Sequence, residues 1–555
     1  MTQTPAETQP QDDESTIQEG MLLDYITGKP KKENPKELVR QRIARALFHE
    51  YGISPDDIKP DYSIATEVDG KTRRKRVSLA VFHPGAEHSD ENLGRVVVCQ
   101  AEPKNGKKGA FKMRDHTQAE KDLQELKNFM TAVPSCQWGL WTNGLEFFFL
   151  QREEARFETR FKPIGDWPPS GETEGTKDLV SDARLRKADP DMLRVAFRRC
   201  HNFIHGNEGM PKDAAFWQFL YLIFAKMHDE RGRGVERRFW ASPTEQFDED
   251  GPEAIRARIT PLFDEVKREY SSIFRGNEEI TLSDRALAFM VSELAKYDFG
   301  RTDVDAKGAA YQEIVGANLR GDRGQYFTPR GAIKLMVAML DPQPEDRIID
   351  PSCGTGGFLV STISHILESL RARREQDAET ESTGEFLSVL DELGSFVKDR
   401  LFGADFDQFL VRASQMNVVM ASNTLANLFH MNSLEFPNGS LDGVGPAGSK
   451  ARLGTMDMVL TNPPFGSDIP ITDRNILKHF ELARIWKPIG GGAFRDTGRE
   501  QGSVSPEILF IERCVQWLKP GGRMGIVLPD GILGNPGDAY IRAWILRHCY
   551  VLASV

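Results

Sequence analysis

The spacing of apolar residues predicts an α/β section near the front of the chain. Asn34 is placed to cap a helix that has Pro35 at its first position and one apolar face. Runs rich in β-branched and aromatic residues then predict strands at 77–82, 95–101, 138–142 and 146–150. A helix is expected at 118–131, and Asn143-Gly144 suits a tight hairpin turn between the last two strands.

The middle of the chain is predicted to be helical. Apolar residues recur at helical spacing over 191–315, and 216–227 carries one wide apolar face that suits the core of a bundle. The stretch before it, 166–190, is rich in proline, glycine and charge, as linkers are. Residues 1–20 are polar and acidic and are expected to form a disordered tail.

From residue 316 onward short apolar strands alternate with helices, which predicts a doubly wound parallel sheet. The strands are expected at 347–350, 401–406, 428–434, 456–460 and 523–529. The charged stretch 371–384 is expected to be a surface insertion between the first two strands. The chain is therefore predicted to be an α/β protein with domains at 21–165, 191–315 and 316–555.

Composition indicates which broad class of protein this chain belongs to. A chain of 555 residues with 39% apolar and 28% charged residues is too long for one core and suits a soluble globular protein. It has no run of about 18 apolar residues and no secretory signal at its start, so we expect a cytoplasmic location. Its six cysteines form no Cys-x-x-Cys pair. The net charge of −11 does not indicate a polyanionic partner, although a local basic cleft or a basic partner subunit could still bind phosphates.

A glycine-rich turn follows the strand at 347–350 and carries the first candidate site. Glycines at a strand-to-helix turn let the backbone approach a ligand closely. The loop lacks the spacing of nucleotide triphosphate or dinucleotide sites, and its acid suits a zwitterion such as the methionine end of S-adenosylmethionine. Its candidate ligands are Asp350, Ser352, Gly354, Thr355, Gly356 and Gly357. Asp405 and Asn432, at the next two strand ends, are placed to meet the ribose and the adenine.

The second candidate site is Asn462-Pro463-Pro464-Phe465, directly after the strand at 456–460. The prolines remove backbone donors and leave carbonyl acceptors beside the Asn462 side chain. Two acceptors can hold a planar amino group, and Phe465 offers a face on which a base can stack. The same four residues would also fit a plain strand-terminating loop, so their neighbours along the chain decide the interpretation.

The order of these motifs resembles that of amino-group DNA methyltransferases, among them the adenine-specific modification subunits of type I restriction systems. The resemblance covers about residues 195–550 and implies a Rossmann-like, S-adenosylmethionine-dependent domain. It also implies that Gln325, Tyr326, Phe327 and Thr328 close over the cofactor. Asn432 stands where the family often has Asp, and an amide can still pair with an adenine edge.

The front section resembles the nuclease-like domain of type I restriction subunits. The strand that ends in Glu102-Pro103-Lys104 and the stretch 138–144 carry this resemblance. A nuclease of that kind needs two carboxylates for Mg²⁺ and a lysine, and Glu102 and Lys104 would be two of the three. Ser78 stands where the family has its metal-binding Asp, so we expect a degenerate fold that serves DNA binding or assembly.

The resemblance implies direct methyl transfer to an adenine that is flipped out of duplex DNA, without a metal. A specificity subunit or a C-terminal target-recognition domain is an expected partner, as are restriction subunits. The sequence stops where the last hairpin of the sheet is expected, which suggests truncation. Two alternatives stay open, namely an amino-group methyltransferase acting on RNA or a protein glutamine, and a non-catalytic DNA-binding or assembly subunit.

Overall fold

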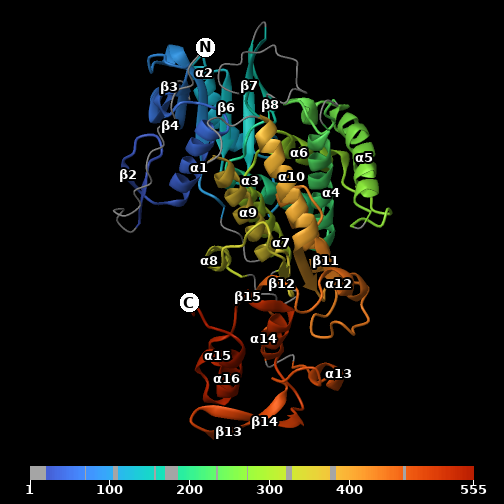
Figure 1. Ribbon diagram of the computed structural model, residues 1–555. Helices are drawn as coiled ribbons and strands as arrows, with labels where there is room; N and C mark the ends of the chain where they lie inside the picture. Colours follow the sequence, from blue (N-terminus) through green and yellow to red (C-terminus); the bar gives the residue numbers. More distant parts are fainter. Residues whose placement is uncertain are drawn as a thin grey trace. The chain divides into compact units, whose positions relative to one another are not determined.

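The computed structural model describes residues 20–68, 71–103, 111–155, 158–168, 185–232, 236–271, 273–319, 328–375, 383–466 and 470–555. The chain divides into two compact units, Met1–Glu269 with Glu278–Thr302, and Tyr270–Asn277 with Asp303–Val555. Figure 1 shows their elements coloured along the sequence. The predicted tail, apart from Gly20, and most of the predicted linker lie outside the described residues.

The first unit contains a six-stranded mixed sheet with the order β3-β4-β5-β6-β7-β8. Its strands are β3 (Ile58–Val68), β4 (Lys71–Phe82), β5 (Leu93–Cys99), β6 (Trp138–Thr142), β7 (Phe147–Ala155) and β8 (Glu158–Ile164). Only β5 and β6 pair in parallel among these neighbours. Two short strands, β1 (Met21–Leu23) and β2 (Pro30–Lys32), form a separate pair. The four predicted strands are confirmed, although β4 begins six residues earlier and β7 ends five residues later than predicted. The strands β3 and β8 were not predicted.

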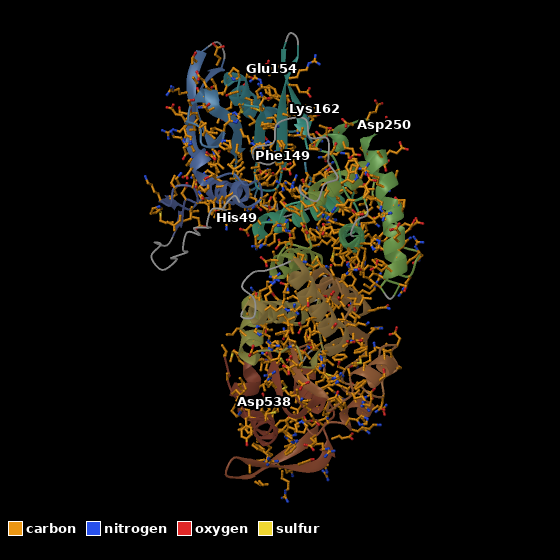
Figure 2. All side chains as sticks on the ribbon, turned by 45° about the horizontal axis from the view of Figure 1, so that its top comes forward. His49, Phe149, Glu154, Lys162, Asp250 and Asp538 are labelled. Carbon is orange, nitrogen blue, oxygen red and sulfur yellow. The ribbon has the colours of Figure 1, made fainter. Side chains whose placement is uncertain are left out.

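Two helices cover opposite faces of this sheet. In α1 (Pro35–His49) the Asn34 side chain accepts a hydrogen bond from the Glu37 amide at 2.9 Å, so the predicted cap is confirmed. The apolar face of α1 packs on Leu79, Val97 and Phe149, whereas α2 (Glu120–Ala132) packs on Val96, Trp141 and Phe148. Figure 2 shows Phe149 within the sheet, and Glu154 and Lys162 farther out on the β7–β8 hairpin.

The helical part of the first unit consists of α3 (Pro190–Asn202), α4 (Lys212–Arg231), α5 (Gly251–Glu269) and α6 (Asp284–Ala295). The predicted helix at 216–227 lies inside α4, whose aromatic and aliphatic residues are almost all buried. The prediction that this segment is helical is therefore confirmed.

The second unit is built on a five-stranded parallel sheet with the order β11-β10-β9-β12-β15. Its strands are β9 (Ile348–Asp350), β10 (Leu401–Asp405), β11 (Asn427–His430), β12 (Met456–Thr461) and β15 (Leu518–Ile526). Because β9 lies in the middle, between β10 and β12, the carboxyl ends of these three strands meet at one edge. An α/β fold is therefore confirmed.

Helices cover both faces of this sheet. The helices of the unit are α7 (Val304–Leu319), α8 (Arg330–Leu340), α9 (Gly357–Glu375), α10 (Thr383–Arg400), α11 (Gln408–Ser422), α12 (Val444–Lys450), α13 (Arg474–Leu477), α14 (Pro506–Trp517), α15 (Asp530–Gly534) and α16 (Ala539–His548). Residues of α8, α9 and α10 pack on one face, and residues of α12 and α14 pack on the other.

The second unit differs from the prediction chiefly in three places. The stretch 371–384 was expected to be an insertion, but α9 continues to Glu375 and α10 begins at Thr383, while 376–382 are outside the described residues. A hairpin of β13 (Arg484–Gly490) and β14 (Ala493–Glu500) was not predicted. The last strand begins at Leu518, earlier than expected, because it pairs with β12 across an irregular register. Among the described residues, no helix is long and apolar enough to cross a bilayer.

Candidate functional site

The glycine-rich loop connects β9 to α9 and depends on two glycines with positive φ. Gly354 has φ +52° and Gly356 has φ +83°, a conformation that other residues adopt at a cost. A Cβ on Gly356 would lie 2.6 Å from the Ser414 hydroxyl of α11, whereas a Cβ on Gly354 would meet no atom within 4 Å. Gly356 is therefore required for packing against α11, and Gly354 lies beside open space.

Asp350 ends β9 and is buried. Its Oδ1 accepts hydrogen bonds from the Thr461 hydroxyl at 2.7 Å and from the Ser352 amide at 3.1 Å. Burial raises the pKa of Asp350 to about 7, although both hydrogen bonds favour the charged form. A carboxylate held in this way would gain from a cationic ligand, since an ammonium group nearby would restore its charged form.

Ser352 joins this loop to the Asn-Pro-Pro-Phe motif. Its hydroxyl lies 2.6 Å from the Thr461 hydroxyl and 3.2 Å from the backbone carbonyl of Asn462. Since Thr461 also bonds to Asp350, the ends of β9 and β12 are locked together by one chain of hydrogen bonds. The two motifs, more than a hundred positions apart in the sequence, lie in one place.

The Asn462 side chain has one amide atom engaged and one free. Its Nδ2 donates to the Thr328 hydroxyl at 2.8 Å. Its Oδ1 is buried and has no hydrogen-bond partner among the described residues. A buried polar atom without a partner is costly in a stable protein, so an unpaired acceptor at a strand end indicates a place for a donor from a ligand.

The residues after Asn462 have different exposures. Pro463 is buried, Pro464 is exposed, and Phe465 keeps 37% of its surface accessible. The loop is held by α14, because the buried carboxylate of Glu507 accepts a hydrogen bond from the Gly466 amide at 3.3 Å. An aromatic ring therefore lies within three residues of the free Asn462 acceptor, on a loop that is fixed at both ends.

Asp405 ends β10, as predicted, and faces the glycine loop. Its two oxygens accept hydrogen bonds from the amides of Gly354 at 2.9 Å and Asp407 at 3.0 Å. Burial raises its pKa above the usual range. The next residue, Phe406, is 67% exposed. The Asp405 carboxylate is thus bonded directly to the glycine loop.

Asn432 lies two residues beyond β11 and is engaged in its own loop. Its Oδ1 accepts from the Leu434 amide at 3.1 Å and its Nδ2 donates to Glu435 at 2.8 Å. A contact of this side chain with an adenine remains a prediction. Thr355 and Gly357 flank Gly356, and the Thr355 carbonyl accepts from Asn417 of α11 at 2.9 Å. Gln325, Tyr326 and Phe327 lie outside the described residues.

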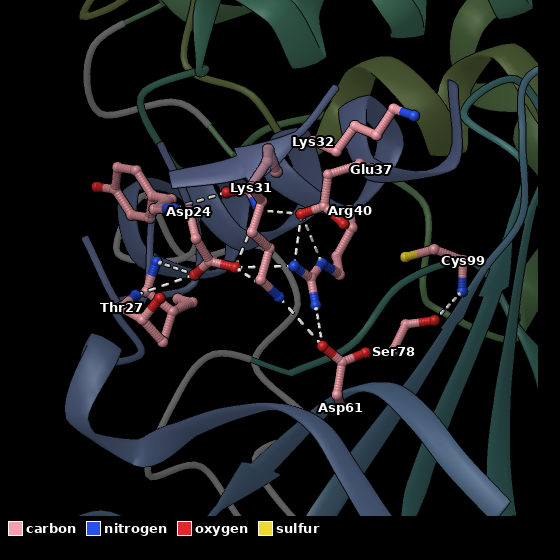
Figure 3. A network of polar contacts seen from close by, with 12 residues as sticks. Asp24, Thr27, Lys31, Lys32, Glu37, Arg40, Asp61, Ser78 and Cys99 are labelled. Atoms are coloured by element: carbon pink, nitrogen blue, oxygen red, sulfur yellow. Dashed lines mark hydrogen bonds and ion pairs between the residues drawn. The ribbon is translucent and has the colours of Figure 1, made fainter. Parts of the chain in front are cut away.

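In the first unit, several carboxylates near the predicted nuclease site form ion pairs with Arg40. Figure 3 shows Arg40 between Asp24, Glu37 and Asp61, with Ser78 beside Cys99. Arg40 lies 2.8 Å from Asp24 and 3.0 Å from Asp61. The Ser78 hydroxyl accepts from the Cys99 amide at 2.9 Å, so no carboxylate occupies that position.

Glu102 belongs to a different set of contacts. Its carboxylate pairs with Arg198 of α3 at 3.0 Å and lies 3.9 Å from Arg42 of α1. Lys104 lies outside the described residues. Among the described residues, no group of three or more His, Cys, Asp or Glu side chains is arranged to hold a metal ion.

Comparison with known proteins shows which families the chain resembles. Residues 302–555 match the N-6 DNA methylase family, and residues 35–168 match the N terminus of the type I restriction enzyme R protein. The chain is 24% identical over 375 residues to the EcoKI methylase subunit of Escherichia coli, with 65% of this chain and 62% of that one covered. The chain is homologous to type I methylase subunits.

A second methylase subunit and a solved structure give further comparisons. The chain is 23% identical over 373 residues to the StySPI methylase subunit of Salmonella potsdam, again with 65% and 62% covered. It therefore spans about 62% of the length of these two relatives. A solved methyltransferase subunit of a type I system from Streptococcus thermophilus aligns over 65% of this chain and 79% of its own, at 15% identity and a TM-score of 0.40.

The sequence prediction missed Thr461 and Asn417, which support the site without belonging to a named motif. Thr461 directly precedes Asn462, and a hydroxyl at a strand end was a usable signal. Asn417 lies inside α11, where its contact with Thr355 depends on how that helix packs, which no local pattern reveals.

Proposed function

We propose that the second unit is a Rossmann-like, S-adenosylmethionine-dependent methyltransferase domain that methylates the exocyclic amino group of adenine in DNA. The homology to type I methylase subunits supports the reaction class. The observation that carries the proposal is the buried, unpaired Oδ1 of Asn462, joined through Ser352 to the glycine loop. An acceptor for an amino group and a loop for a cofactor thus belong to one site.

The residues of the glycine loop fit S-adenosylmethionine. Asp350 offers a buried carboxylate to its ammonium group, Gly354 leaves the backbone open on the ligand side, and Gly356 lets the loop pack against α11. Asp405 offers its remaining lone pairs to the ribose hydroxyls. Thr328, beside Asn462, belongs to the segment with Gln325, Tyr326 and Phe327 that we propose closes over it. When bound, S-adenosylmethionine supplies an electrophilic methyl group.

Asn462 and its neighbours prepare the amino group of the flipped base. The Oδ1 of Asn462 and the carbonyl of Pro463 accept its two hydrogens, which orients the nitrogen lone pair away from them. These acceptors then stabilise the positive charge that develops on the nitrogen, as oxyanion-hole donors do for the opposite charge. Phe465 stacks on the ring and holds the base in place.

Substrate and partners follow from the same proposal. The substrate is duplex DNA, with the target adenine flipped out at a cost of a few kcal/mol. We propose that a specificity subunit or a C-terminal target-recognition domain selects the site, within a restriction-modification or related phage-defence system that also includes restriction subunits.

We further propose that the front fold is a degenerate nuclease that serves DNA binding or assembly. Support comes from Ser78 in place of the expected Asp and from the pairing of Glu102 with Arg198. Mg²⁺-dependent nicking of plasmid DNA by the purified chain, lost in Glu102→Ala, would overturn this proposal.

The test is transfer of labelled methyl groups from S-adenosylmethionine to genomic DNA that lacks adenine methylation, followed by mapping of the labelled base. We expect labelled N6-methyladenine. Parallel reactions contain total RNA or a cell lysate as the acceptor. Label in RNA or protein with none in DNA, under conditions where cofactor binding is intact, would contradict the proposal and favour the amino-group alternatives.

A further inference from the structure

The β3–β4 hairpin of the first unit carries a cluster of cations that the site does not use. Arg73, Arg74, Lys75 and Arg76 follow one another along β4, in a chain whose net charge is −11. Arg73, Arg74 and Arg76 are exposed and Lys75 is partly buried. Among the described residues, none of these four side chains forms an ion pair. We call residues 63–67 and 72–76 the basic ribbon.

The basic ribbon extends beyond the rest of the sheet. The strand β5 pairs with β4 from Leu79 to Phe82, whereas 72–76 pair with β3. Successive side chains of a strand alternate between its faces, so Arg74 and Arg76 share one face and lie about 7 Å apart. Arg73 and Lys75 occupy the other face, which gives the ribbon cationic side chains on both faces.

The residues opposite these cations do not neutralise them. In register, Arg73, Arg74, Lys75 and Arg76 face Thr66, Ala65, Ile64 and Ser63. The ribbon's carboxylate, Glu67, is opposite Thr72. Asp61, just before the ribbon, is already engaged by Lys31 at 3.1 Å and Arg40 at 3.0 Å. Among the described residues, the positive charge of the ribbon is therefore not paired across the hairpin.

The β7–β8 hairpin of the same sheet provides an internal comparison. There Glu153 lies directly opposite Arg160, and Glu154 lies opposite Thr159, so acidic and basic residues are mixed. Edge strands often carry charges that prevent aggregation. In the basic ribbon, four cations follow one another on β4, beyond its pairing with β5, and no acidic residue lies between them. The concentration of one sign of charge therefore distinguishes the ribbon from the β7–β8 hairpin.

We propose that the basic ribbon binds the phosphate backbone of duplex DNA. Duplex DNA carries one negative charge per about 1.7 Å of helix axis, and its major groove admits a two-stranded β-ribbon. Arginine suits phosphate because its planar guanidinium donates two parallel hydrogen bonds. The proposal rests on the proposed function in taking DNA as the polyanion, and it gives the front fold a role that needs no metal.

The test compares the full chain with its Arg74→Gln/Arg76→Gln variant. Binding to a labelled 30-base-pair duplex of arbitrary sequence is measured by fluorescence anisotropy from 50 to 200 mM KCl, without S-adenosylmethionine. The control is Lys212→Gln/Arg301→Gln, which removes two exposed cations from the helical part of the same unit. Cofactor binding by each protein, measured by calorimetry, verifies that the second unit is folded.

We expect the plot of log affinity against log salt to become less steep by about 2 in the ribbon variant and to stay unchanged in the control. Equal slopes for the ribbon variant and the wild type, or no duplex binding by the wild type at 50 mM KCl, would overturn the proposal. A loss of slope with duplex RNA but not with DNA would also overturn it. Because no methyl transfer is measured, a reduced DNA slope would support the ribbon even if the chain methylated no DNA.

Discussion

The hydroxyl of Thr461 donates a hydrogen bond to the carboxylate of Asp350 at 2.7 Å and joins the ends of two neighbouring strands, β12 and β9. Replacing Thr461 by valine keeps the shape but removes this donor to a buried carboxylate. Hydrogen bonds to charged groups contribute about 1.5–3 kcal/mol, so S-adenosylmethionine should bind roughly 10- to 150-fold more weakly to Thr461→Val. Calorimetric titration measures this loss. Thr461→Ser should restore most of the affinity, and equal affinities for the valine variant and the wild type would contradict the assigned role.

The pKa of Asp350 makes the stability of the second unit depend on pH. Burial raises this pKa to about 7, so above pH 4 the folded state retains a proton that the unfolded chain releases. Stability must therefore fall as the pH rises from about 4 to 7, by about 4 kcal/mol at most for this group, and level off above 7.

The variant Asp350→Asn tests this dependence, because its amide oxygen can still accept from Thr461 but does not titrate. Calorimetry should show that the asparagine variant gains stability over the wild type at pH 8 and loses that advantage at pH 5. The transition of the second unit is the one that S-adenosylmethionine shifts. If the stability of both proteins depended on pH in the same way, Asp350 would not titrate with a raised pKa in the folded state.

Two glycines of the loop should respond differently to alanine. Both have positive φ, which costs a residue with a Cβ about 1–2 kcal/mol. At Gly356 the Cβ would also lie 2.6 Å from the Ser414 hydroxyl, whereas at Gly354 it meets nothing. Thermal unfolding should therefore show a larger loss of stability for Gly356→Ala than for Gly354→Ala. The reverse order would mean that the loop does not pack on α11 as described.

Phe465 should contribute to substrate binding rather than to cofactor binding. Stacking of a base on an aromatic ring contributes about 1–3 kcal/mol, so Phe465→Ala should raise the KM for DNA roughly 5- to 150-fold. Phe465→Trp should keep the KM near that of the wild type. The matched control is Phe247→Ala, which removes a ring of similar exposure, 39% against 37%, from the first unit. Equal KM values for Phe465→Ala and this control would mean that Phe465 does not bind the target base.

Local pattern was sufficient for the residues that end a strand or begin a helix. The Asn34 cap, Asp350 at the end of β9 and Asp405 at the end of β10 each lie where their own sequence neighbours predict. The helix α10 was missed because the charged stretch before it suggested an insertion. Its buried residues Val389, Leu393, Phe396 and Val397 nevertheless recur at helical spacing, so the signal was present.

The connections between motifs could not be predicted from local pattern. The contact of Ser352 with Asn462 exists because β9 and β12, far apart in the sequence, are neighbours in the sheet. Their pairing depends on the strand order and the register, which a single sequence does not specify. The contact of Asn432 with the Leu434 amide is different. An asparagine side chain that accepts from the amide two residues ahead forms a local turn, which the sequence alone could have predicted.

The most direct test of the central claim is the rate of methyl transfer to DNA by Asn462→Ala, measured together with its affinity for S-adenosylmethionine. If the unpaired Oδ1 of Asn462 accepts from the reacting amino group, its loss should raise the barrier by about 3–4 kcal/mol, a fall of roughly 10²- to 10³-fold in kcat. Cofactor affinity should stay within about threefold of the wild type. Asn128→Ala, on α2 of the first unit, serves as the control and should retain full activity. An Asn462→Ala protein that methylates DNA at the wild-type rate would contradict the account.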